Sequence, residues 1–117
     1  MAQDCLFCKI VTGEIPATIV YEDDDVVAFK DISPQAPVHI LVVPRAHIER
    51  LSDATEADAN LLGKIVLAGN RVASLFGVAE SGYRLIANTG PDGGQEVFHV
   101  HFHVLGGKKL GRMVQQG

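Results

Sequence analysis

The stretch "VFHVHFHVL", residues 97–105, alternates apolar residues with histidines, which is typical of a β-strand with two different faces. Successive side chains of a strand point to opposite faces of the sheet. The three histidines (His99, His101 and His103) therefore share one face, and the apolar residues between them share the other. We expect the apolar face to pack on a helix and the imidazole face to stay free for chemistry.

The sequence before this strand alternates between short apolar runs and turn residues, with one longer helical pattern. In the longer pattern apolar residues recur at spacings of three and four, Thr55 and Asp58 resemble a capping box, and Gly77 suits the position after the helix. The patterns predict a helix over about residues 5–11, a hairpin within 17–34, a strand over 38–44, a helical turn or two over 45–51, a long helix over about 55–76 and a fourth strand over 82–88.

This order of elements predicts an α+β fold rather than an alternating βαβ fold. Only the long helix could serve as a crossover between parallel strands, so we expect a mostly antiparallel five-stranded sheet with one long and one short N-terminal helix. A length of 117 residues fits one domain, residues 1–117, of which about 108–117 form a C-terminal tail.

The composition excludes several classes of function. A net charge of −4 argues against a nonspecific nucleic-acid binder, which needs a basic face. The N-terminal residues do not resemble a signal peptide, and no apolar run approaches the ~20 residues of a membrane span. We therefore expect a cytoplasmic protein without nucleic-acid or membrane partners, in which Cys5 and Cys8 are thiols or metal ligands rather than a disulfide.

The histidine run has three possible explanations. Buried structural histidines are disfavoured, because each of three rings on one face would need its own hydrogen-bond partners. A mononuclear zinc hydrolase would need His39 or His47 as well, because the first and third rings of such a strand lie ~13 Å apart. The remaining explanation is nucleophilic attack on phosphorus by a neutral imidazole, with the glycine-rich loop at residues 89–96 approaching the phosphate.

The motifs resemble the histidine triad nucleotide-binding (HIT) family. "HVHFHVL" matches the family motif of three histidines separated by single apolar residues, and "DISPQAPVHILVVP" and "GYRLIANTGPDGGQEVFHVHFHVLGG" are similar to its purine nucleoside phosphoramidase branch. The similarity runs from about residue 5 to 107. It implies a homodimer that hydrolyses the P–N bond of adenosine or guanosine 5′-phosphoramidates, with no organic cofactor. Two rival functions stay open, a noncatalytic purine-nucleotide sensor and the zinc hydrolase above.

The resemblance also implies roles for individual residues. His101 would be the nucleophile, His103 would contact the phosphate, and His39 would support the nucleophilic ring. Asp31 would accept hydrogen bonds from the ribose hydroxyls. The residues around the α-phosphate and leaving group would be Asn88, Gly94, Gln95 and Val97. The residues that sandwich the purine would be Leu6, Phe7, Ile10, Phe29, Ile32 and Leu41.

The chain departs from the better-known animal members at two places. Glu96 stands where they carry a serine that donates to the phosphoramide nitrogen, and an ionised glutamate cannot donate. The tail "KKLGRMVQQG" also lacks their tryptophan. Both differences bear on which leaving group the protein would accept.

The cysteine pair is interpreted as half of a structural zinc site. Cys5 and Cys8 would be completed by His47 and His99, the two histidines not needed for the chemistry, as one zinc ion per chain. Members of the family with this pair resemble zinc proteins of that composition. Two idle thiols are the alternative.

Overall fold

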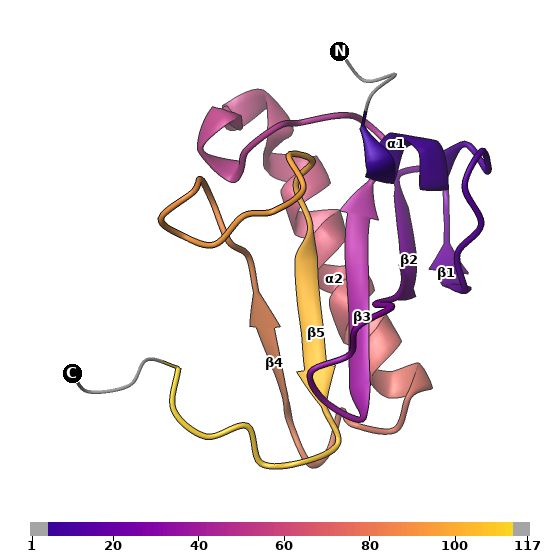
Figure 1. The fold of residues 1–117 in the computed structure, drawn as a ribbon, viewed down its shortest axis with the longest axis vertical. Coiled ribbons are helices and arrows are strands. Elements are labelled where there is room, and N and C mark those ends of the chain that lie inside the picture. The colour runs from indigo at the N-terminus through magenta and orange to yellow at the C-terminus, as the bar shows by residue number, and fades with distance from the viewer. Residues whose placement is uncertain (1–4, 114–117) are drawn as a thin grey trace.

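A computed structural model describes residues 5–113, and its elements follow the expected order (Figure 1). They are α1 (Leu6–Val11), β1 (Ile19–Glu22), β2 (Val26–Lys30), β3 (Val38–Pro44), two 3₁₀ turns (Leu51–Asp53 and Glu56–Asp58), α2 (Ala59–Leu75), β4 (Tyr83–Ile86) and β5 (Phe102–Gly106). The predicted α+β class, with one long helix and a short N-terminal helix, is confirmed.

The five strands form one sheet in the order β1-β2-β3-β5-β4, and every neighbouring pair is antiparallel. Figure 1 shows β3 and β5 in the middle of the sheet and β4 at one edge. In the register of the two central strands, Leu41 lies opposite His103. The histidine strand is therefore flanked on both sides, which restricts the path of its backbone.

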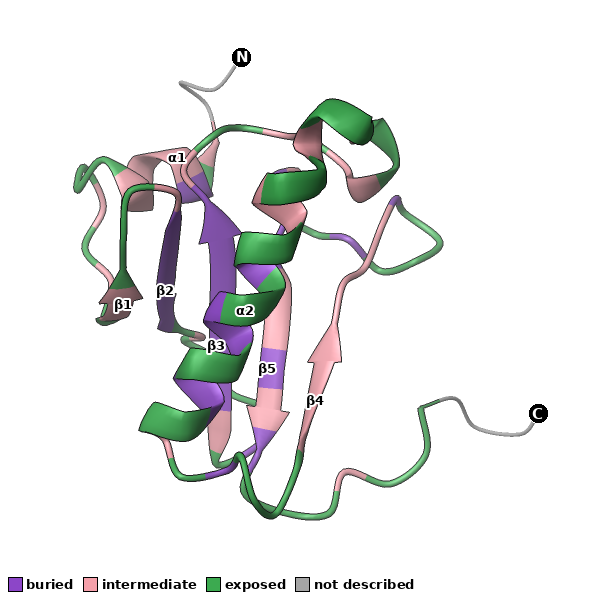
Figure 2. Ribbon diagram, turned by 180° about the vertical axis from the view of Figure 1, so that it is seen from behind, coloured by how far each residue is buried: buried purple, intermediate pink, exposed green. Residues whose placement is uncertain are grey.

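Helix α2 covers one face of the sheet, and its buried residues face the strands (Figure 2). Ile65 and Val72 of the helix pack with Val42 of β3 and Val104 of β5 in the main core. Phe102 packs against the same core, so the apolar face of the histidine strand meets the helix as predicted. Within residues 5–113, no helix is both long and apolar enough to cross a membrane.

The ends of α2 use the signals seen in the sequence. Thr55 and Asp58 form the predicted capping box. The Asp58 carboxylate accepts from the Thr55 backbone N–H, and the Thr55 hydroxyl accepts from the Ala57 backbone N–H. Gly77, just after the helix, has a φ of 73°, a left-handed conformation that suits glycine. The helix itself begins only at Ala59, because the first turn after the cap is a 3₁₀ turn.

Three predicted elements are wrong in extent or type. Residues 45–50 do not form a helical turn but an irregular segment with bends, and the Ile48 carbonyl accepts from the Val100 N–H at 2.7 Å. The fifth strand begins at Phe102 rather than at residue 97, because β3 pairs with it only as far as Val42. The fourth strand is also shorter than predicted and ends at Ile86.

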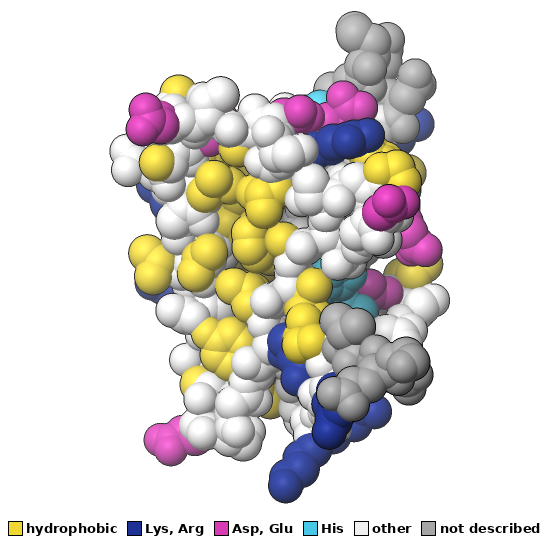
Figure 3. Space-filling model, turned by 90° about the vertical axis from the view of Figure 1, so that its left-hand side faces the viewer, with side chains coloured by type: hydrophobic (Ala, Val, Ile, Leu, Met, Phe, Trp, Pro, Cys, Tyr) yellow, Lys and Arg dark blue, Asp and Glu magenta, His cyan; other side chains and the backbone are white. Residues whose placement is uncertain are grey.

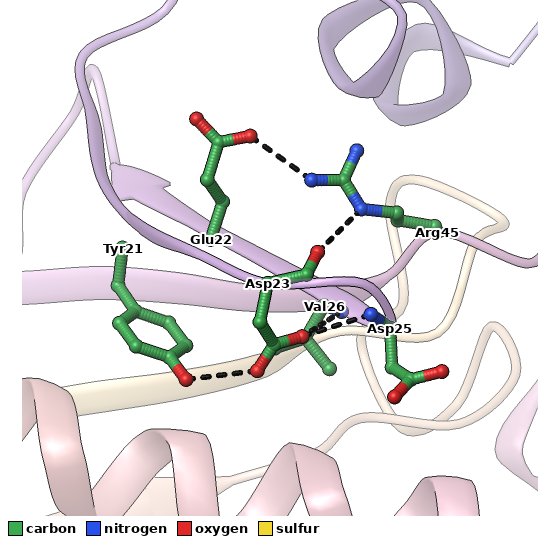
Figure 4. A network of polar contacts seen from close by, with 6 residues as sticks. All are labelled: Tyr21, Glu22, Asp23, Asp25, Val26 and Arg45. Carbon is green, nitrogen blue, oxygen red and sulfur yellow. Dashed lines mark hydrogen bonds and ion pairs between the residues drawn. The ribbon is translucent and has the colours of Figure 1, made fainter.

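The acidic run in the β1–β2 hairpin forms a turn, as its composition predicts. Asp23 accepts from the N–H groups of Asp25 and Val26 at 2.8 and 2.9 Å, and Tyr21 donates to its other oxygen (Figure 4). Arg45, just after β3, donates to the Asp23 carbonyl and pairs with Glu22. These carboxylates stabilise a turn and anchor the end of β3.

Candidate active site

A cavity of about 450 Å³ opens on the sheet face opposite α2, between α1, the strands β2 and β3 and the loop that leads into β5. Its floor belongs to a second, smaller core in which Phe7, Phe29 and Leu41 pack together. The lining residues are Leu6, Phe7, Ile10, Ile15, Pro16, Ala17, Phe29, Lys30, Asp31, Ile32, Ser33, Leu41, Asn88, Gly94, Glu96, Val97, His101 and His103. The cavity is therefore apolar at the α1 end and polar at the loop end.

The His101 ring lies at the polar end with only 7% of the residue exposed. Its Nδ1 lies 2.7 Å from the His99 carbonyl oxygen, and a carbonyl can only accept, so Nδ1 carries the proton. Phe7 packs edge-on against the ring, with the ring centroids 5.0 Å apart. Burial lowers the pKa of His101, so the neutral ring keeps an unprotonated Nε2 at neutral pH.

His39 and His103 form a second imidazole system next to His101. The Gln35 backbone N–H donates to His39 Nδ1 at 3.0 Å, so the proton of the neutral ring lies on Nε2. The His39 Nε2–H donates to His103 Nδ1 at 2.9 Å. Asp31 Oδ2 lies 3.4 Å from His39 Nε2. His103 is therefore left with its proton on Nε2, the nitrogen that is free to donate to a ligand.

Burial is the main reason why both rings stay neutral. Burial lowers the pKa of His39 in spite of the Asp31 carboxylate. Burial, together with the His101 and His39 rings, lowers the pKa of His103 to about 4. The direct contact of His39 is with His103, and the proton of His101 is oriented by the His99 carbonyl. That His39 supports the nucleophilic ring stays a prediction.

The rings also lie closer together than an ideal strand predicts. The centroids of His101 and His103 are 5.1 Å apart, compared with roughly 6.6–7 Å along a regular strand. The backbone turns at Val97 and His99, where the His99 N–H donates to the Val97 carbonyl, and His101 lies outside the β5 ladder. The two rings can therefore act on one small group.

His99 belongs to a different cluster. Its Nε2 donates to the Pro44 carbonyl at 2.8 Å, which leaves the Nδ1 lone pair for Cys5 at 3.3 Å and Cys8 at 3.5 Å. His47 Nδ1 lies 3.2 Å from His99 Nδ1 and 3.3 Å from Cys8 Sγ. These four ligand atoms all lie within 4.8 Å of one another. The structure thus brings together the four residues that the sequence analysis assigned to a metal.

The donor set fits a tetrahedral metal ion. Metal–sulfur and metal–nitrogen bonds of about 2.3 and 2.0–2.1 Å give ligand–ligand edges of about 3.3–3.8 Å in a tetrahedron, close to the separations seen here. Burial and the neighbouring Cys5 raise the pKa of the Cys8 thiol to about 11, so a cation is needed to favour the thiolate. The cluster can therefore hold a metal ion with all four positions filled by the protein.

The predicted ligand-contacting residues meet at one site, with one exception. Among the described residues, the lining of the cavity includes all the predicted nucleotide contacts except Gln95. The Gln95 side chain is buried and bonds to three backbone groups instead. The backbone groups of Gln35, Pro44 and His99 that orient the imidazoles were missed, and because every residue type carries them, the sequence offers no signal for them.

Comparison with known proteins agrees with this geometry. The HIT domain model matches residues 12–110. Over 114 residues the chain is 49% identical to the purine nucleoside phosphoramidase of Escherichia coli K12, covering 97% of this chain and 96% of the relative. It is also 52% identical, over 94% of this chain and 96% of the relative, to an uncharacterized HIT-like protein of Synechococcus elongatus.

Solved structures of HIT proteins have the same fold as this chain. A HIT family hydrolase from Clostridium thermocellum superposes with a TM-score of 0.93 at 49% identity, covering 97% of this chain and 98% of that chain. A histidine triad protein from Clostridium difficile superposes with a TM-score of 0.91 at 50% identity, covering 95% of this chain and 96% of that chain. With the motif, the fold and the cavity in agreement, this chain belongs to the HIT domain family.

Proposed function

We propose that this protein is a purine nucleoside phosphoramidase that cleaves the P–N bond of adenosine or guanosine 5′-phosphoramidates through a nucleotidyl-histidine intermediate. The observation that carries the proposal is the His101 ring, whose Nδ1 proton is bonded to a carbonyl and whose Nε2 is unprotonated in the cavity. A neutral imidazole is a good nucleophile and a good leaving group at phosphorus. The name of the Escherichia coli relative supports the same reaction.

The reaction takes two displacements. His101 Nε2 attacks phosphorus, the P–N bond breaks, and the amine leaves with a proton from solvent. Water then attacks the phosphorus, the bond to Nε2 breaks, the nucleoside monophosphate leaves and a proton returns to solvent. His103 Nε2–H donates to a phosphoryl oxygen, where negative charge increases. Glu96 lines the cavity as a hydrogen-bond acceptor, and it faces the leaving group rather than protonating it.

The nucleoside occupies the apolar end of the cavity. The purine lies between α1 and the sheet, where Leu6, Ile10 and Ile32 form the rim and Phe29 and Leu41 form the floor. Asp31 accepts hydrogen bonds from the ribose hydroxyls. One Asp31 oxygen accepts from the Ser33 N–H at 2.8 Å, which fixes the carboxylate in an orientation toward the cavity.

The metal of the Cys5, Cys8, His47 and His99 cluster is zinc, one ion per chain, with a structural role. Two thiolates and two imidazoles are the set that zinc prefers, and four protein ligands leave no position for water. The reducing cytoplasm, where we place the protein, keeps both thiols available. The ion connects α1, which lines the nucleotide cavity, to the backbone next to His101.

The protein acts as a homodimer through the β4 edge and the adjacent side of α2. Figure 3 shows hydrophobic side chains gathered on the side of the molecule where β4 lies. Val66 of α2 is 37% exposed and lies one turn before Asn70, which accepts from the Tyr83 hydroxyl of β4. Pairing two β4 edges would cover these groups and satisfy the unpaired backbone of the edge. The C-terminal tail would then reach the partner's cavity, although its last residues, 114–117, lie outside the described part.

The decisive experiment measures turnover of a fluorogenic adenosine phosphoramidate by wild type and His101→Ala. The variant should lose several orders of magnitude in kcat, and an adduct of one AMP should appear by intact mass only on wild type. Saturable AMP binding without turnover would favour the sensor instead. Immediate loss of activity on chelation would favour the zinc hydrolase, since a structural ion acts only through folding.

A further inference from the structure

The polar end of the cavity is formed by a loop with little regular structure. Residues 87–101 connect β4 to β5, and Asn88, Gly94, Glu96 and Val97 from this loop line the cavity. The part of the loop before Val97, residues 88–96, has two backbone bonds, from the Gly94 N–H to the Pro91 carbonyl and from the Gln95 N–H to the Gly90 carbonyl. Both are local, so they do not fix this part of the loop against the rest of the protein.

The Gln95 side chain connects two separate points of this loop with a segment outside it. Its carbonyl oxygen accepts from the Gly90 N–H at 2.9 Å, and its amide nitrogen donates to the Val97 carbonyl at 3.1 Å. The same nitrogen donates to the Glu49 backbone carbonyl at 2.7 Å. One buried amide, 6% exposed, therefore satisfies three backbone groups that come from three places in the chain.

The segment that receives Gln95 is itself fixed. Ile48 is bonded to Val100, the residue before His101, and the Arg50 guanidinium lies over the Phe98 ring at 5.5 Å. Two residues before Glu49, the His47 side chain enters the metal cluster. Residues 47–50 thus run between the metal cluster and the backbone that carries the reacting imidazole, and Gln95 attaches the loop to this support.

We propose that Gln95 is a positioning residue, which places the loop backbone at Gly94 around the phosphate without touching the nucleotide itself. This inference rests on the proposed function, and it replaces the predicted ligand contact of Gln95. Gly94 and Glu96, on either side of it, line the cavity, whereas the Gln95 side chain points to the backbone groups behind the loop. The role needs a primary amide, because one acceptor and two donors must come from the same end group.

Two substitutions separate the donors from the acceptor. Gln95→Met removes both, and it takes their side-chain partner from the Gly90 N–H and the Glu49 carbonyl, whereas the Val97 carbonyl still accepts from the His99 N–H. Gln95→Glu keeps an acceptor for the Gly90 N–H but cannot donate to both the Glu49 and Val97 carbonyls, because a carboxyl group offers at most one O–H. Val72→Ala, in the main core under α2, serves as a control that lowers the melting temperature at a distance from the cavity.

The test measures kcat, KM, AMP affinity, melting temperature and amide exchange for all four proteins. Both Gln95 variants should lose roughly 10–100-fold in kcat, because small displacements of binding groups cost that much. Their AMP dissociation constants should change less than about threefold, because the purine and ribose contacts lie elsewhere. Val72→Ala should keep the wild-type kcat, and the Gly90 amide should exchange faster in Gln95→Met without any ligand.

Three results would overturn the proposal. These are a wild-type kcat in Gln95→Met, an unchanged exchange rate of its Gly90 amide, or a matching kcat loss in Val72→Ala at the same loss of melting temperature. Absence of turnover in wild type would refute the proposed function instead. The proposal for Gln95 would then be judged by amide exchange alone, where faster exchange supports it and unchanged exchange overturns it.

Discussion

The low pKa of His103 predicts a specific pH dependence of stability. The group has a pKa of about 4 in the folded protein and 6.5 as the ordinary value. Below pH 6.5 His103 binds a proton in the unfolded chain but stays neutral in the folded protein. The free energy of unfolding should therefore fall between pH 6.5 and 4. Above pH 7 both states are neutral and His103 should contribute no pH dependence.

The magnitude follows from the size of the shift. At about 1.36 kcal/mol per pKa unit, the two values give a loss of about 2 kcal/mol between pH 7.5 and pH 5. Because the ring is partly accessible to solvent, screening reduces this, and we expect about 1–2 kcal/mol. His103→Asn keeps an acceptor for His39 Nε2–H but cannot titrate. The substitution does not change burial, which is the main cause that lowers the pKa of His39 and His101.

The assay is urea unfolding followed by circular dichroism, because the chain has no tryptophan. Wild type and His103→Asn are measured at equal protein and zinc concentrations from pH 7.5 to pH 5, so that dimerisation and metal release affect both alike. The difference between the two unfolding free energies should change by about 1–2 kcal/mol across this range. Parallel curves, within about 0.5 kcal/mol, would refute the description of His103 as a ring kept neutral by its surroundings.

Three further predictions concern the metal, the ribose and the dimer. Cys8→Ala should release the metal and lower the melting temperature, and metal analysis of wild type purified without chelator should give one zinc per chain; clearly less would remove the zinc assignment. Asp31→Asn should weaken AMP binding about tenfold and abolish the preference for AMP over its 2′,3′-dideoxy analogue in calorimetry, and an equal preference in both proteins would exclude the ribose contact. Val66→Asp should convert the dimer into a 12.5 kDa monomer by light scattering, whereas a monomeric wild type at micromolar concentration would refute the dimer.

Much of the fold could be predicted because its signals are local. The period of the α2 pattern, the capping box at Thr55 and the glycine after the helix all depend on residues near one another in the chain. Residues 45–51 were mistaken for helix because their conformation is decided by residues 95–100, more than 40 positions away. Alternation also overstated the length of the fifth strand, because its pairing with β3 stops at Phe102, opposite Val42, although β3 continues to Pro44.

The sequence predicted which residues form the candidate site better than it predicted which of their atoms contact one another. Side-chain types at fixed spacing identified the histidine face and the four residues whose ligand atoms cluster closely enough to hold a metal ion. The partners within the site depend on tertiary geometry, which pairs His39 with His103 and turns the Gln95 side chain away from the cavity. A residue-type pattern indicates which chemistry is present, but it does not indicate which atom of each ring carries the proton.

The backbone partners of the imidazoles have a consequence for inheritance and for design. The carbonyls of Pro44 and His99 and the N–H of Gln35 determine which nitrogen is protonated in three rings, and only a change to proline at position 35 would delete one of these backbone groups. Neighbouring residues can therefore vary among relatives without changing which nitrogen is reactive. Conversely, three histidines placed on a regular strand of another protein would provide the same side chains without the same reactivity, because the backbone groups that orient their protons would be missing.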